Sequence, residues 1–187
     1  MLDNVYNAKI IEYAGNIERT GRLEAPDATA KAHSKLCGST VVVDLKMEDG
    51  PEGSPEGRVV TDFAHEVKAC ALGQASSSIM ARTIIGATAA ELKALKKTMY
   101  AMLKDNGPPP EGRFAEFRFL EPVRDYKARH ASTLLTFDAV VDCIEQIEAK
   151  EKAAAAAAKQ VRAEKREKAT KAAVHALGAA GIKFKLR

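Results

Sequence analysis

Two stretches of alternating apolar and polar residues on either side of a turn-rich loop constrain the fold most strongly. Residues 39–50 read STVVVDLKMEDG, and their alternation from Val41 to Met47 predicts a strand with one buried face and with Asp44 on the solvent face. The following DGPEGSPEG is rich in Gly and Pro, which favour turns. Residues 58–70 predict a return strand. Its expected inner face consists of Val59, Thr61, Phe63, His65, Val67 and Ala69. The pair predicts an antiparallel hairpin.

The segments around the hairpin predict one more strand and several helices. Helical spacing is seen over residues 3–16, 71–84 and 88–106. Residues 28–34 favour a first strand, and Thr88 with Glu91 forms a capping-box pattern. A short apolar segment ends at Pro122, and a long helix begins near Ala131. This order predicts an α+β fold with a small antiparallel three-stranded sheet, helices packed on one face, and a long Ala-rich C-terminal helix.

The cysteine count bears on the compartment in which this chain of 187 residues folds. Such a chain is long enough to bury a core without disulfides, and three cysteines argue against a disulfide framework. They favour a reducing compartment. The first residues lack the pattern of a secretory signal, and no apolar stretch is long enough to cross a bilayer. We therefore expect a cytoplasmic protein with no membrane partner.

The positive charge is concentrated at the C-terminal end. From Glu148 onward the chain has 11 Lys and Arg against 4 Asp and Glu, a balance of +7 within a net charge of +4. We therefore expect a domain over residues 1–148 and a basic, Ala-rich tail, helical or partly disordered, over residues 149–187. A solvated helix accounts for this tail better than a nucleic-acid surface does, so nucleic acid is not an expected partner.

Two of the cysteines are expected at the same end of the hairpin. Cys37 precedes the first hairpin strand, and Cys70 ends the second and opens a helix. A helix N-terminus favours the thiolate, which is the form that binds metal or attacks sulfur. The three serines at 76–78 would let this helix lie close to its neighbours, with hydroxyls bonded to carbonyls of the preceding turn. The alternative is that both cysteines are small buried apolar residues.

The order LCGS, hairpin, CALGQASSSI resembles the NifU/IscU/SufU family of iron–sulfur cluster assembly scaffolds. In that family Cys-Gly-Asp precedes a strand, and a second cysteine is followed five residues later by Ala-Ser-Ser-Ser, here from Ala75. The N-terminal VYNAKIIEYAGNIERTG also resembles the family's first helix and turn, with Asn16 and Gly21 retained. The resemblance covers residues 5–146 and implies a SufE/NifU-like fold.

The chain departs from the family pattern at two positions. Ser39 stands where the family has Asp, and the third cysteine, at the start of the last long helix, is missing. Matching the preceding His130 puts Ala131 at that position, and matching FDAV puts Ser132 there. Cys143 lies three helical turns further on, which favours a place in the core or a groove.

The resemblance leaves Cys37, Cys70 and His130 as the expected metal ligands, with Cys37 and Cys70 holding the cluster. Two thiolates and an imidazole suit iron in a cluster, or zinc. The fourth ligand would be water, Ser39, a partner residue or a second subunit. A homodimer in which each subunit supplies Cys37 and Cys70 would bind a [2Fe–2S] cluster through four thiolates. His65 shares the expected inner face with Phe63, which favours a core or rim position.

The resemblance implies a non-enzymatic scaffold or carrier that binds iron and an Fe–S cluster transiently and passes the cluster on. Its partners would be a cysteine desulfurase and apo Fe–S acceptor proteins. One alternative is a sulfur acceptor that takes persulfide sulfur from the desulfurase. Another is a zinc-binding member that no longer assembles clusters. The sequence contains no hydrolase triad, phosphate-binding loop or dinucleotide fingerprint.

Overall fold

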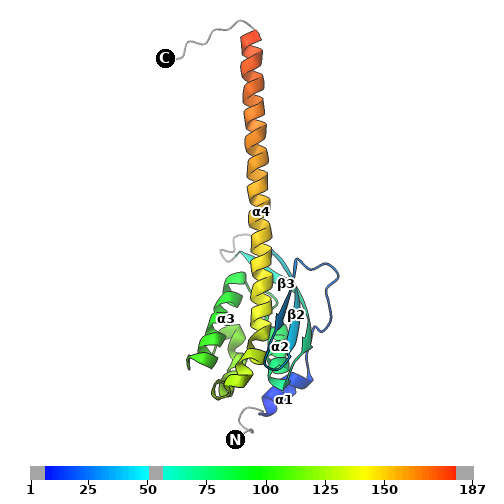
Figure 1. The fold of residues 1–187 in the computed structure, drawn as a ribbon, viewed down its shortest axis with the longest axis vertical. Helices are drawn as coiled ribbons and strands as arrows, with labels where there is room; N and C mark the ends of the chain where they lie inside the picture. Colours follow the sequence, from blue (N-terminus) through cyan, green and yellow to red (C-terminus); the bar gives the residue numbers. More distant parts are fainter. Residues whose placement is uncertain (1–6, 51–56, 180–187) are drawn as a thin grey trace. The chain divides into compact units, whose positions relative to one another are not determined.

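The computed structural model describes residues 7–50 and 57–179. Its elements are α1 (Ala8–Gly15), β1 (Ala28–His33), β2 (Thr40–Asp49), β3 (Arg58–Lys68), α2 (Ala71–Thr83), α3 (Ala89–Lys104), the 3₁₀ helix η1 (Gly112–Asp125) and α4 (Lys127–Ala179) (Figure 1). Contacts between residues divide the chain into two units, Met1–Ile147 and Glu148–Arg187.

The three strands form one antiparallel sheet in the order β1-β2-β3, as the sequence predicted. Val41, Val43, Leu45 and Met47 of β2 are all buried on its inner face. On the outer face Asp44 is also buried, although the alternation predicted exposure. Its carboxylate accepts hydrogen bonds from the Arg22 guanidinium at 2.6 and 2.9 Å and from the Thr29 hydroxyl at 2.6 Å.

The predicted inner face of β3 is wrong in its first half. The pairing of β2 with β3 shifts register between Lys46 and Met47, so that Met47 pairs with Val60. Such an irregularity moves the residues on one side of it to the opposite face. Val60 is therefore buried, while Thr61 is exposed and Val59 is half-buried.

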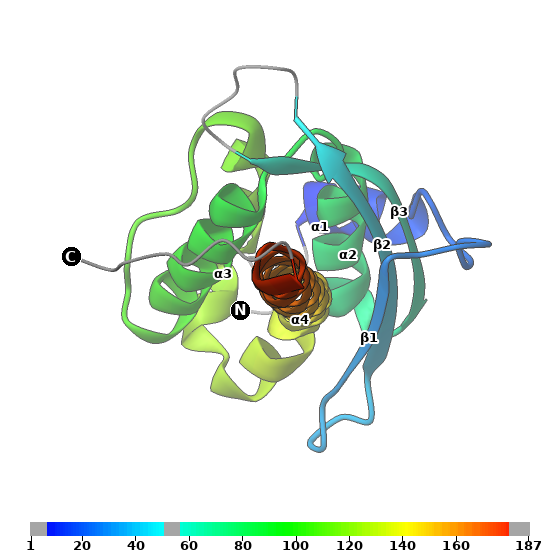
Figure 2. The ribbon, with the colours of Figure 1, turned by 90° about the horizontal axis from the view of Figure 1, so that it is seen from above.

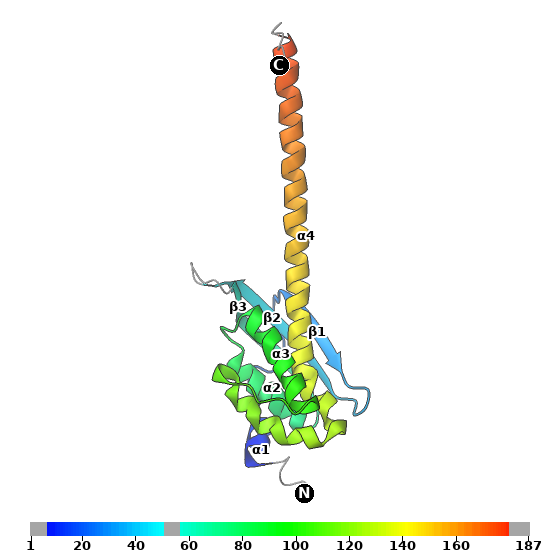
Figure 3. The same cartoon turned by 90° about the vertical axis from the view of Figure 1, so that its left-hand side faces the viewer.

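Helices cover one face of the sheet, which confirms the predicted α+β class (Figure 2, Figure 3). Helix α2 lies against α1, η1 and β3. Residues 127–147 of α4 bring Cys143 into the core, where its Sγ is 3.5 Å from the carbonyl of Val43. Of the two places predicted for Cys143, the core or a groove, the structure shows the core.

The start of α3 follows the sequence pattern closely. The amide of Glu91 donates to the Thr88 hydroxyl, and the Thr88 amide donates to the Glu91 carboxylate.

The region before α4 differs from the prediction. Pro122 lies inside η1 rather than ending it, and α4 begins at Lys127.

The second unit is described as helical up to Ala179. All the side chains described from residue 149 to residue 174 are exposed, including Val161 and Val174. This segment has no apolar stripe to bury, as expected from its Ala-rich and charged composition. No helix in the described ranges, 7–50 and 57–179, combines the length and hydrophobicity needed to span a membrane.

Candidate metal and cluster site

The sheet register brings the segments that carry Cys37 and Cys70 to the same end of the hairpin, as the sequence predicted. Thr40 at the start of β2 pairs with Lys68 at the end of β3. Cys37 lies three residues before Thr40, and Cys70 lies two residues after Lys68. No disulfide involves these cysteines, both of which lie within the described chain.

Cys37 is exposed in the tight loop that joins β1 to β2. The loop is closed by a hydrogen bond from the Ser34 amide to the Ser39 carbonyl and another from the Gly38 amide to the Ser34 carbonyl, both 2.9 Å long. Gly38 has φ of 70°, a left-handed conformation that glycine adopts without strain. The hairpin therefore presents the Cys37 thiol on a defined turn.

Two buried serine hydroxyls flank the Cys37 thiol. The Sγ atom is 3.3 Å from Oγ of Ser34 and 3.0 Å from Oγ of Ser39. Hydrogen bonds from Ser34 and then from Ser39, together with the Ser39 backbone and the charge of Arg129, lower the pKa of the Cys37 thiol below its ordinary value. Hydrogen bonds to the charged form favour that form, so the loop stabilises a thiolate.

Cys70 is the N-cap residue of α2 and is half-buried. Its Sγ is 3.4 Å from Oγ of Ser132, and the Ser132 hydroxyl also donates to the carbonyl of Arg129 at 3.0 Å. Cys70 thus contacts the first turns of α4 through Ser132, and Arg129 of the same turns contributes to the lowered pKa of Cys37. This convergence joins residues 62 positions apart in the sequence.

Gly73 permits this close approach of α2 to α4. A Cβ atom at Gly73 would lie 2.7 Å from Cβ of Ala69 and 2.9 Å from the carbonyl oxygen of Ser132. Both distances are shorter than side chains tolerate, so only glycine fits here without movement of a helix. Gly73 does not stand out in the sequence, because only the helix crossing gives it a role.

The three serines of α2 pack closely against neighbouring elements, but their hydroxyls do not bond to the preceding turn. Ser76 donates to the carbonyl of Thr133 in α4 at 2.8 Å, and Ser78 donates to the carbonyl of Asn16 after α1 at 3.0 Å. The Ser77 hydroxyl is buried without a hydrogen-bond partner among the described residues. Ser76 therefore holds α2 to α4, and Ser78 holds it to the segment after α1.

His130 is buried, and its ring contacts backbone carbonyls. Its Nε2 is 3.0 Å from the carbonyl of Arg124 and 3.2 Å from that of Val123. Among the described residues, no three side chains of His, Cys, Asp or Glu are gathered closely enough to hold a metal ion. His130 is thus not assembled with Cys37 and Cys70 in this conformation, and its role as a ligand stays a prediction.

His65 takes the core position that its face predicted. It is fully buried, with Nε2 2.9 Å from the carbonyl of Glu18 and its ring against Phe63, and burial lowers its pKa. Its Nδ1 has no hydrogen-bond partner among the described residues. A neutral imidazole satisfies these surroundings better than a charged one does.

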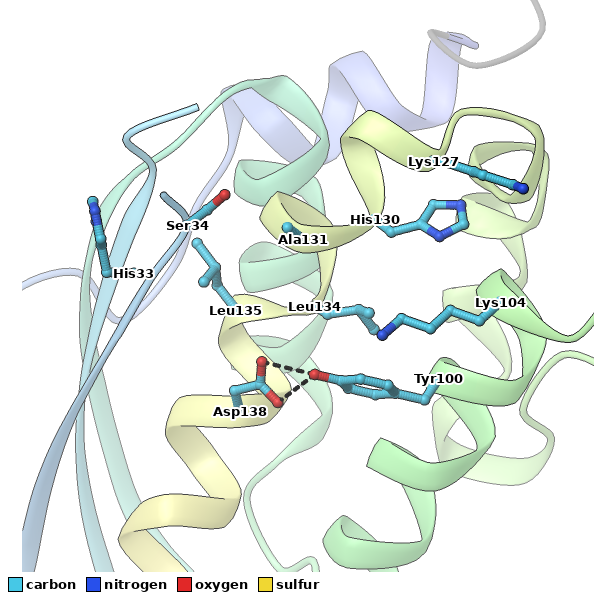
Figure 4. Close-up of a pocket in the computed structure, with 10 residues that line it drawn as sticks. All are labelled: His33, Ser34, Tyr100, Lys104, Lys127, His130, Ala131, Leu134, Leu135 and Asp138. Atoms are coloured by element: carbon cyan, nitrogen blue, oxygen red, sulfur yellow. Dashed lines mark hydrogen bonds between the residues drawn. The ribbon is translucent and has the colours of Figure 1, made fainter. Parts of the chain in front are cut away.

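A cavity of about 500 Å³ lies between α3, the start of α4 and the end of β1 (Figure 4). Ser34, whose hydroxyl contacts the Cys37 thiol, and Ala131, which precedes Ser132, both line it, whereas neither cysteine does. The two alternative positions for the missing cysteine therefore differ in surroundings. Ala131 faces this cavity, whereas Ser132 is buried against Cys70.

The chain is similar in sequence to known proteins. Residues 5–133 match the model of the family described as NifU-like N terminal domain. The iron-sulfur cluster assembly scaffold protein IscU of Thermotoga maritima is 25% identical over 143 residues, which cover 76% of this chain and 94% of that protein.

Solved structures agree with this match. The crystal structure of a nitrogen-fixing NifU-like protein (N-terminal) from Brucella abortus has 69% sequence identity and a TM-score of 0.74, covering 80% of this chain and 98% of that chain. An iron-sulfur cluster assembly scaffold protein for the SUF system from Fervidobacterium islandicum is 20% identical, with a TM-score of 0.65 over 75% of this chain and 97% of that chain. The latter likeness concerns the fold alone.

Proposed function

This chain belongs to the family of NifU-like N-terminal domains, and from that premise we propose that it is an iron–sulfur cluster assembly scaffold whose cargo binds Cys37 and Cys70. The observation that carries the proposal is the Cys37 thiol, exposed on a tight turn and hydrogen-bonded to Ser34 and Ser39, at the hairpin end that also carries Cys70. Thiolates are the ligands that iron–sulfur clusters use.

The donor set fits a transient cargo better than a resident one. Two thiols leave a cluster with further positions to be filled by other molecules, and such a site releases its cargo more readily than four protein thiolates would. We include His130 as a third ligand, which requires its ring to leave the carbonyls of Val123 and Arg124. A [2Fe–2S] cluster shared by two copies of the chain is the alternative that needs no movement of His130.

The proposal implies partners that supply sulfur and accept the cluster. A cysteine desulfurase would deliver sulfur to the exposed Cys37, and apo Fe–S proteins would receive the cluster by ligand exchange. The serine hydroxyls assist the first step, because their hydrogen bonds favour the nucleophilic thiolate form of Cys37. The chain's own role is to bind and position the cargo, without turnover of a substrate.

Anaerobic reconstitution with iron and sulfide tests the scaffold function. The wild-type protein should develop the visible absorption of a cluster, Cys37→Ala and Cys70→Ala should not, and Cys143→Ala should behave as the wild type. Cys143 is the matched control because it is buried in the core. Absence of any cluster absorption in the wild type would overturn the proposal.

Two measurements separate the alternative functions. Added sulfur on Cys37 or Cys70 after incubation with a cysteine desulfurase and iron, found by mass spectrometry while no cluster forms, would indicate a sulfur acceptor. Stoichiometric zinc that resists exchange by iron, in protein purified without added metal, would indicate a zinc-binding member of the family. Neither outcome is expected for a scaffold, on which the delivered sulfur goes on to form a cluster with iron.

A further inference from the structure

The cavity beside the cysteines has the size and lining of a small-molecule site. Its volume of about 500 Å³ is within the range of ligand pockets. Leu134 and Leu135 supply an apolar wall, and Lys104 and Lys127 supply cationic groups. Figure 4 shows Tyr100 and Lys104 entering from α3, opposite Ser34 and Ala131 (Figure 4).

The charge of the cavity is positive because its carboxylate is already neutralised. Asp138 accepts from the Tyr100 hydroxyl at 2.9 and 3.0 Å and pairs with Lys96 at 2.9 Å. Burial and the hydrogen bond to Asp138 raise the pKa of Tyr100 to about 12, so this hydroxyl stays a donor at neutral pH. The Asp138 carboxylate therefore has little charge left to offer to a ligand.

Lys104 and Lys127 are available to an anion. Nζ of Lys104 lies 4.5 Å from the centre of the Tyr100 ring. Neither lysine has a carboxylate within ion-pair distance in the described part of the chain. Two cations above an apolar wall are suited to a small molecule with carboxylates and a short aliphatic body.

One end of the cavity is formed by Ser34 and Ala131, which lie next to residues of the two-thiol site, although neither cysteine lines the cavity. Ser34, which lines the cavity, has its hydroxyl 3.3 Å from Sγ of Cys37. Ala131 lines it as well and precedes Ser132, whose hydroxyl contacts Sγ of Cys70. The Ala131 methyl group offers no ligand to a metal. His130 also lines the cavity, but its Nε2 contacts the backbone carbonyls of Val123 and Arg124, so in this conformation a donor at this end is best supplied by a bound molecule.

We propose that this cavity binds a small thiol that carries carboxylates, which pair with Lys104 and Lys127, while its sulfur reaches the Ala131 end and supplies the third ligand of the cargo in place of His130. On coordination the thiol releases its proton to solvent, and no electron is transferred. The coordination step rests on the scaffold function proposed above. The binding of carboxylates to the metal-free protein does not depend on it.

Binding to the metal-free protein is measured with mercaptosuccinate, succinate and 2-mercaptoethanol by calorimetry and by amide chemical shifts. Mercaptosuccinate and succinate should bind and shift the amides of Ser34, Ala131 and Leu134, whereas 2-mercaptoethanol should not. Lys104→Ala and Lys127→Ala should each weaken succinate binding about threefold to tenfold. Lys97→Ala is the matched control, because Lys97 is an exposed lysine of α3 outside this cavity, and it should bind as the wild type does.

The cluster-loaded protein tests the role of the sulfur. Mercaptosuccinate should lengthen cluster lifetime, succinate and 2-mercaptoethanol should not, and the effect should disappear in Lys104→Ala. In Ala131→Cys the added thiol should become unnecessary. The ligand proposal is overturned if the dicarboxylates do not bind, if Lys104→Ala binds them normally, or if only an acidic cysteine-containing peptide binds. Carboxylate binding without any cluster in the wild type would instead count against the scaffold function.

Discussion

The thiol of Cys37 lies 3.0 Å from the hydroxyl of Ser39, a position where the family pattern leads one to expect aspartate. A hydroxyl can donate to a thiolate, whereas a carboxylate would repel it. The chain thus has an uncharged donor beside the thiol that is proposed to take up the cargo. This donor should make the Cys37 thiol more reactive, and the reactivity of the thiol in turn should affect release of the cargo.

Replacement of Ser39 should make Cys37 less reactive at neutral pH. Ser39→Ala removes one hydrogen bond and Ser39→Asp adds a negative charge, so both should raise the pKa of Cys37, the second variant more than the first. The measurement is the pH dependence of Cys37 alkylation by iodoacetamide, followed by mass spectrometry. Ser132→Ala, whose lost hydroxyl contacts Cys70 instead, should leave the Cys37 profile unchanged. An unaltered profile in Ser39→Asp would contradict the role assigned to Ser39.

The two positions considered for the missing thiol should behave differently. Ala131→Cys places a thiol in the cavity next to Ser34, so it should tighten metal binding and lengthen cluster lifetime. Ser132→Cys places a buried thiol against Sγ of Cys70, so it should change metal affinity little and form a disulfide with Cys70 on oxidation. Metal titration and thiol counting distinguish the variants. If neither variant alters cargo binding, Cys37 and Cys70 are not part of such a site.

Gly73→Ala should destabilise the protein and disturb the Cys70 site together. The added methyl group would overlap Ala69 and the Ser132 carbonyl, which should lower the free energy of unfolding by about 1–3 kcal/mol. Gly15→Ala is the control, because no heavy atom lies within 4 Å of a Cβ there, and it should be neutral or slightly stabilising. Urea denaturation measures both. Equal effects of the two substitutions would contradict the close contact of α2 with α4.

His65 should make stability depend on pH. Burial lowers its pKa from the ordinary 6.5, so below about pH 6.5 the unfolded chain binds more protons than the folded chain, and the free energy of unfolding falls as pH decreases. His65→Phe should lose this part of the pH dependence. At pH 7.5 it should cost less than about 1.5 kcal/mol, because the lost bond to Glu18 is offset by removal of the unpaired Nδ1. Urea midpoints at pH 7.5 and 5.5 measure the difference, and an unchanged slope in His65→Phe would exclude His65 as its cause.

The tail should be dispensable for the fold and for the proposed site. Truncation after Ala149 removes only residues whose described side chains are exposed, so the melting temperature should change by less than about 3 °C. Truncation after Asp142 is the control, because it removes the buried Cys143, Ile144 and Ile147 and should unfold or strongly destabilise the domain. A large loss of thermal stability after the first truncation would show that the tail supports the domain.

The sequence by itself determined the parts of the fold that depend on local patterns. Alternation over β2 and the Thr88–Glu91 capping box specify their elements through neighbouring residues, so these predictions are confirmed. The predicted Gly- and Pro-rich turn falls on residues 51–56, which lie outside the described part of the chain. The antiparallel pairing of β2 with β3 also followed, and with it the placement of the segments bearing Cys37 and Cys70 at one end of the sheet.

Only the tertiary structure decided the contacts that join distant segments. The register shift at Lys46 and Met47 depends on how β2 and β3 pair, and alternation within one strand cannot reveal it. The contact of Cys70 with Ser132 and the need for glycine at position 73 arise where α2 crosses α4. His130 faces backbone carbonyls because the packing of η1 against α4 sets its direction, and spacing in the sequence has no information on that packing.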